Sequence, residues 1–112
     1  MVIEVTTIHI EQRYLDGFQA ALPEALSIIG CADGYIGHRV DQSTDDPCRY
    51  TLTVRWKDQE SAIDRFRESG RMKEVRYVLN RYYDERPRTS YSIESDLGFI
   101  GETNASSEPV AC

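Results

Sequence analysis

The stretch from Arg49 to Ala62 constrains the fold most, because it changes from a strand pattern to a helix pattern without an intervening loop. Leu52, Val54 and Trp56 alternate with polar residues, which is the period of a half-buried strand. Asp58 follows as a candidate helix N-cap, and the single tryptophan of the chain stands at the junction. The sequence before this stretch predicts two strands and a helix, and the sequence after it predicts helices and one more strand.

The segments before the junction change their periodicity twice. Residues 2–10 are rich in Val, Ile and Thr and predict a strand. Residues 11–30 carry apolar side chains at steps of three and four, which indicates one buried helix face. Pro23 either kinks this helix or begins a second helical segment. Residues 35–42 predict a second strand, whose two faces are Ile36, His38 and Val40 on one side and Tyr35, Gly37, Arg39 and Asp41 on the other.

The segments after the junction complete the order of elements. Residues 58–69 and 71–83 predict two helical pieces separated at Gly70, and residues 88–95 predict the fourth strand. The order is β-α-β-β-α-β, which is the ferredoxin-like α+β arrangement: an antiparallel sheet with both helices on one face.

One domain over residues 1–95 is therefore expected, followed at 96–112 by a tail that is weakly ordered or packs on a partner. Both sheet faces carry apolar residues, with Val5 and Ile93 on one parity and Ile8 and Tyr35 on others. A second copy of the chain would cover the face that the helices leave open, so we expect a homodimer.

Charge and composition exclude several classes of partner. The net charge of −6 argues against nucleic acid, and the lack of a long apolar run argues against a membrane span. The N-terminal residues do not form a signal peptide, and three cysteines at irregular spacing predict reduced thiols in a cytoplasmic protein. Between Arg65 and Arg88 bases outnumber acids, which indicates either a solvated helix face with ion pairs or an anchor for an anionic small molecule.

The sequence also argues against metal, nucleotide and covalent hydrolase chemistry. The two histidines, His9 and His38, are far apart and have no carboxylates at ligand spacing. A phosphate-binding glycine loop, a nucleophile elbow and a dinucleotide fingerprint are all missing. We therefore expect no bound metal and no flavin. An aromatic pocket with a few polar groups between sheet and helices is the remaining form of a small-molecule site.

Four pieces of the chain, in order and spacing, resemble the antibiotic biosynthesis monooxygenase family, the dimeric α/β-barrel proteins that include small quinol oxygenases. They are Gly34–Val40, Tyr50–Trp56, Phe66–Ser69 and the set Arg76, Tyr82, Tyr83, Pro87 and Tyr91. Within this pattern the family's third-strand Asn, four residues before the Trp, is Leu52 here. The resemblance implies a dimeric barrel and a cofactor-independent monooxygenase that acts on a small aromatic, quinol or polyketide substrate in secondary metabolism.

Three residues form the predicted catalytic set: His38, Trp56 and Arg76. His38 would take a phenolic or enolic proton, Trp56 would form a substrate wall, and Arg76 would stabilise the resulting anion. The alternatives are a hydrogen-bonded core histidine, a core tryptophan and a surface ion pair. Four further residues are predicted to bind substrate or, alternatively, only to pack: Phe66, Tyr82, Tyr83 and Tyr91.

Two functional classes stay open at this point. The first is the cofactor-free oxygenase, in which a deprotonated substrate reacts directly with dioxygen. The second is a non-oxidative member of the fold, either a cyclase or isomerase of reactive polyketides or a binding protein. Haem degradation ranks third, because the relatives that degrade haem use a helical His as iron ligand and His38 is the last histidine of this chain.

Overall fold

The computed structural model describes residues 1–94, and these form the predicted β-α-β-β-α-β order with short helical turns added. The strands are β1 (Val2–His9), β2 (Tyr35–Gln42), β3 (Arg49–Trp56) and β4 (Arg88–Ile93). The helical elements are η1 (Gln12–Tyr14), α1 (Leu15–Gly30), η2 (Glu60–Arg67), α2 (Gly70–Leu79) and η3 (Asn80–Tyr82). Ser95 and the predicted tail lie outside the described residues.

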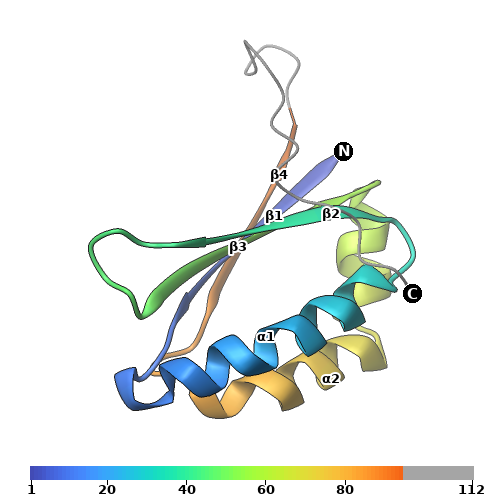
Figure 1. Cartoon of the computed structure of the whole chain (residues 1–112). Helices are drawn as coiled ribbons and strands as arrows, with labels where there is room; N and C mark the ends of the chain where they lie inside the picture. Colours follow the sequence, from blue (N-terminus) through green and yellow to red (C-terminus); the bar gives the residue numbers. More distant parts are fainter. Residues whose placement is uncertain (95–112) are drawn as a thin grey trace.

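The four strands make one antiparallel sheet in the order β2-β3-β1-β4. Figure 1 shows α1 and α2 side by side on one face of this sheet, while no described helix covers the other face. This is the ferredoxin-like α+β fold that the order of elements predicted. Because β2 and β4 are the edges, β1 and β3 form the middle of the sheet and supply most of its buried side chains.

The helices differ in detail from the prediction. α1 runs without interruption past Pro23, which sits on its exposed side, so this proline does not begin a second segment. The cap at Asp58 is confirmed, since its Oδ1 accepts the backbone N–H of Ser61 at 2.8 Å. The helix predicted after it is η2, which has the wider π-type hydrogen bonding, and the last predicted helix ends at Leu79 with a single further turn, η3.

Two assignments of residues to sheet faces were wrong. A bulge between Tyr35 and Gly37 shifts the register, so that Tyr35 pairs with Trp56 on the same face as His38. Ile93 pairs with Val2 and therefore lies on the sheet face that the helices cover, whereas Val5 lies on the opposite face. Both errors come from long-range pairing, which alternation within one strand does not report.

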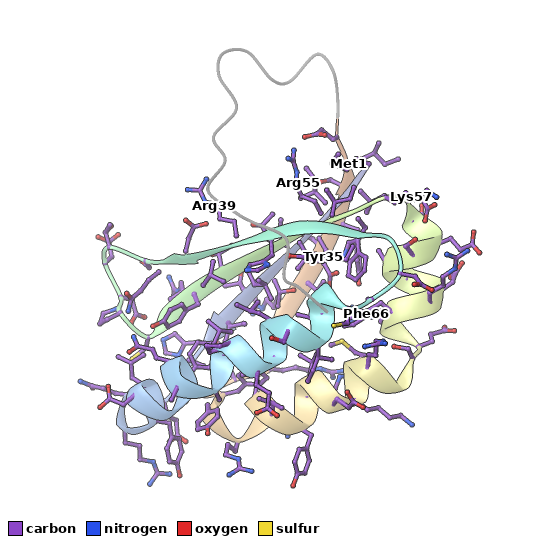
Figure 2. All side chains as sticks on the ribbon, turned by 45° about the vertical axis from the view of Figure 1, so that its right-hand side comes forward. Met1, Tyr35, Arg39, Arg55, Lys57 and Phe66 are labelled. Atoms are coloured by element: carbon purple, nitrogen blue, oxygen red, sulfur yellow. The ribbon has the colours of Figure 1, made fainter. Side chains whose placement is uncertain are left out.

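The core lies between the sheet and the two helices. Phe18, Ala25 and Ile29 of α1 and Val75 and Leu79 of α2 pack against the inward side chains of β1 and β3. Figure 2 places Phe66 between the sheet and the helices and shows Arg39 and Arg55 projecting from the opposite, open face. Within the described residues, no helix is long and apolar enough to cross a membrane.

Candidate functional site

A cavity of about 380 Å³ lies between the sheet and α2. Its walls come from β1, β3, η2, α2 and the segment from η3 into β4. The lining residues are Glu4, Thr6, Ile8, Ile29, Leu52, Val54, Trp56, Phe66, Arg67, Met72, Val75, Arg76, Leu79, Asn80, Tyr83, Arg86, Pro87 and Thr89. This volume suits a small organic molecule, and the mixture of apolar walls with a few charged groups is typical of ligand sites.

Trp56 and Phe66 form the aromatic part of the cavity wall. Trp56 is fully buried at the end of β3, and its ring lies 5.2 Å from the Phe66 ring, centroid to centroid. Trp56 faces inward because it continues the alternation of Leu52 and Val54. Phe66 reaches it from η2, the helix that begins directly after the strand. The predicted substrate wall therefore lies in the cavity, together with a second aromatic side chain from the next element.

Glu4 is the residue that the sequence analysis missed. It lies on the inward parity of β1, is only 8% exposed and lines the cavity. Its Oε1 accepts the indole N–H of Trp56 at 2.8 Å. Burial raises the pKa of the Glu4 carboxyl, and the Trp56 N–H, the nearby Arg67 and the Tyr91 hydroxyl oppose this shift. The clue in the sequence was an acid at a core position, between Val2 and Ile8.

Arg67 and Tyr91 hold the other side of Glu4. The Nη1 of Arg67 donates to the Tyr91 hydroxyl at 2.7 Å, and that hydroxyl lies 3.5 Å from Oε2 of Glu4. Burial, and then the charge of Glu4, raises the pKa of Tyr91, so its hydroxyl stays protonated at neutral pH. Tyr91 does not line the cavity itself, and its position supports Glu4 and Arg67 instead.

Arg76 lines the cavity from α2, near Tyr83. Burial raises the pKa of Tyr83 to about 12, and the positive charge of Arg76 opposes this rise. Within residues 1–94 neither Arg76 nor Arg86 forms an ion pair, although both line the cavity. The cavity therefore presents two unpaired guanidinium groups and a neutral phenol to a bound molecule.

His38 is near this cavity but is not part of its lining. It shares the inward face with Trp56, as predicted, because it pairs with Val54. Its Nδ1 lies 2.6 Å from the Tyr35 hydroxyl, and the Tyr35 ring packs edge-on against Trp56 at 6.4 Å. Burial lowers the pKa of the His38 imidazole. No described residue of β2 lines the cavity, so His38 has no contact with it.

Tyr82 also lies outside the cavity lining. Its ring packs edge-on against Tyr14 of η1 and Phe18 of α1. Four of the seven predicted site residues thus line one cavity, namely Trp56, Arg76, Phe66 and Tyr83, whereas His38, Tyr82 and Tyr91 do not. Within the described part of the chain, no group of three or more His, Cys, Asp or Glu residues is placed to hold a metal ion.

Comparison with known proteins gives one family. The family model for antibiotic biosynthesis monooxygenase matches residues 1–77. YczJ of Bacillus subtilis, an uncharacterized protein, is 30% identical over 91 residues, which cover 81% of this chain and 96% of YczJ. A solved structure from Bordetella bronchiseptica has a TM-score of 0.78 at 24% identity, covering 84% of this chain and 96% of that one. SnoaB of Streptomyces nogalater, a cofactor-independent oxygenase, has a TM-score of 0.68 at 12% identity, covering 93% and 95%.

Proposed function

Because this chain belongs to the antibiotic biosynthesis monooxygenase family, we propose that it is a cofactor-independent monooxygenase that oxidises a small aromatic, quinol or polyketide substrate. One observation carries the proposal: a cavity of about 380 Å³ has aromatic walls at Trp56 and Phe66 and is lined by Arg76, which forms no ion pair within residues 1–94. The description of SnoaB as a cofactor-independent oxygenase supports it. The proposal includes a homodimer in the cytoplasm.

The proposed reaction takes its electrons from the substrate. Loss of a proton from an activated CH₂ group leaves an electron pair on carbon, and this carbanion reduces dioxygen and forms a C–O bond. Protonation of the peroxide and loss of water then give a ketone, so that CH₂ and O₂ become C=O and H₂O. Trp56 and Phe66 would hold the ring and exclude water. Arg76, which is exposed but lines the cavity, and the Tyr83 hydroxyl would stabilise the anion.

Oxygen uptake with 1,4-naphthohydroquinone tests the proposal, because the diketo tautomer of this compound carries the activated CH₂ group. Products are compared under air and under nitrogen. Arg76→Met should lower kcat/KM by roughly 10²–10³-fold, as expected for loss of a preorganised cation. Arg71→Met is the matched control, because Arg71 is exposed at the start of α2 and does not line the cavity. Oxygen uptake no faster than without enzyme, or an equal effect of both substitutions, would reject the proposed function.

A non-oxidative cyclase, isomerase or binding protein is the second candidate, and Leu52 favours it. Leu52 forms part of the cavity wall. Its apolar side chain offers no hydrogen bond to dioxygen or to a peroxide intermediate. Under this alternative, the products formed under air and under nitrogen would be the same, and oxygen would not be consumed.

A further inference from the structure

Glu4 is an unusual residue for the middle of a sheet. Among the described residues it is the one charged side chain that is buried, and it is the one acid that lines the cavity. Burying a carboxylate costs free energy unless hydrogen bonds and opposite charge compensate it. Here the carboxyl lies at the aromatic end of the cavity, beside Trp56 and near Arg67.

The two carboxyl oxygens of Glu4 are held unequally. Oε1 accepts a short hydrogen bond of 2.8 Å from the indole N–H of Trp56, which fixes the plane of the carboxyl. Oε2 lies 3.5 Å from the Tyr91 hydroxyl, which is too long for a strong O–H···O bond. Oε2 is therefore the oxygen that keeps the capacity to accept a proton, while Oε1 can keep its hydrogen bond to Trp56.

The other titratable groups around the cavity are poorly suited to accept a proton. Burial keeps Tyr83 protonated, and the guanidinium groups of Arg67, Arg76 and Arg86 are always charged. His38 does not line the cavity, and its Nδ1 lies 2.6 Å from the Tyr35 hydroxyl.

From this geometry we infer that Glu4 is the general base of the cavity and takes a proton from an aromatic carbon acid or phenol that lies against Trp56 and Phe66; the inference rests on the proposed function. The new O–H bond forms at Oε2, the C–H or O–H bond of the substrate breaks, and its electron pair stays on the substrate as an enolate or phenolate. Glu4 becomes neutral as the substrate becomes anionic, so the total charge in the cavity does not change. The raised pKa of Glu4 makes it a stronger base than an exposed glutamate.

Hydrogen–deuterium exchange at the C1 methylene of 2-tetralone, followed by NMR in D₂O under nitrogen, tests proton removal without any oxygen chemistry. The wild-type protein should accelerate the exchange, and Glu4→Gln should lose about 10²–10⁴-fold of that rate. Glu24→Gln is the matched control, since Glu24 is exposed on α1. Fluorescence of Trp56 should report binding of the probe to Glu4→Gln within a few-fold of the wild-type affinity.

Further readouts separate a base from a carboxyl that only holds Trp56. The wild-type exchange rate should fall at acid pH as Glu4 becomes protonated. The residual exchange rate of Glu4→Gln should not show this fall. Glu4→Asp, whose carboxyl is one methylene shorter, should exchange more slowly but should keep the fall at acid pH. This variant replaces Glu4→Gln as the test if Glu4→Gln fails to fold. Exchange by Glu4→Gln within a few-fold of wild type, or no exchange by the wild-type protein, would overturn the inference.

The two proposals can fail separately. Exchange that depends on Glu4, without oxygen uptake from any candidate quinol, would support the base and reject the oxygenase. Oxygen uptake that is equal in wild type and Glu4→Gln would support the oxygenase and reject the base.

Discussion

At the scale of single residues, Trp56 contacts both the buried carboxyl of Glu4 and the aromatic residues around it. Its indole N–H binds Glu4 of β1, and its ring packs on Phe66 of η2 and on Tyr35 of β2. One fully buried side chain thus fixes the carboxyl and the aromatic wall of the cavity together. Truncation to Ala would cost about 3–5 kcal/mol of stability, so Trp56→Phe is the better probe of the hydrogen bond to Glu4.

The two histidines have opposite environments. His9 lies between two carboxylates, with Nε2 2.9 Å from Asp46 and Nδ1 3.0 Å from Asp84. A carboxylate only accepts hydrogen bonds, so both contacts are satisfied only when both ring nitrogens carry a proton. The bond to Asp46 is the largest of the effects that raise the pKa of His9, whereas burial lowers the pKa of His38.

These shifts predict opposite pH dependences of the free energy of unfolding. The stabilisation from His9 should be complete below the unfolded pKa of about 6.5 and should disappear as the pH rises through the higher folded pKa. The penalty from His38 should appear as the pH falls from about 6.5 through its lower folded pKa. Urea unfolding of wild type, His9→Ala and His38→Ala between pH 5 and 9 at low salt measures both effects. If the free energies of unfolding of His9→Ala and His38→Ala, each relative to wild type, changed in the same direction with pH, the opposite pKa shifts of the two histidines would be contradicted.

At the scale of elements, the turn between α1 and β2 depends on Gly34. Its φ of 84° lies in the left-handed region, and a Cβ built there would overlap Oγ of Ser61 in η2. The carbonyl of Gly34 accepts the N–H of Lys57 at 2.7 Å, which ties the turn to the end of β3. The position of η2, and with it Phe66, therefore depends on this close approach.

Gly34→Ala should lower the free energy of unfolding by about 2–4 kcal/mol, because it adds both backbone strain and overlap with Ser61. Gly70→Ala is the matched control at the start of α2, where an added Cβ meets no atom within 4 Å. It should change stability by less than about 1 kcal/mol, in either direction. Urea unfolding with a common m value compares the two, and equal losses would show that Gly34 is not the constraint described.

At the scale of the whole molecule, the open face of the sheet is the main uncovered surface of the described residues. Figure 1 shows both long helices on the opposite side. Val5 in the middle of β1 points to the open face and is only partly exposed, with Thr53 and Ser90 beside it. Arg55 pairs with Glu94 at one end of the same region. A sheet face that the helices leave open can be covered by a second copy of the chain.

We predict a homodimer that is closed by this face, with twice the chain mass in light scattering at micromolar concentration. Val5→Lys would place a charge in the middle of the interface and should shift the protein towards monomer. Tyr77→Lys is the matched control, because Tyr77 is 77% exposed on α2, away from the sheet. A wild-type monomer, or dissociation by both substitutions, would reject this interface.

Local sequence patterns were enough to predict the order of elements and most of the inward side chains. Alternation in β3 and helical spacing in α1 are local patterns, and burial of an apolar face follows from them directly. That is why Trp56 could be placed at the cavity in advance, whereas Phe66 was predicted from the family resemblance. The parity of Glu4 in β1 was equally local, and it could have been recognised as a buried acid.

Which polar groups meet depends on contacts between distant segments of the fold. The pairing of β1 with β3 brings Glu4 to Trp56 across 52 positions of sequence. The pairing of β1 with β4 brings Tyr91 to the same carboxyl, and η2 brings Arg67 to it. β2 lies at the edge of the sheet and carries a bulge, and His38 on this strand contacts Tyr35 and stays outside the cavity lining. Strand order and register depend on contacts between distant segments, and periodicity within one strand carries no information about them.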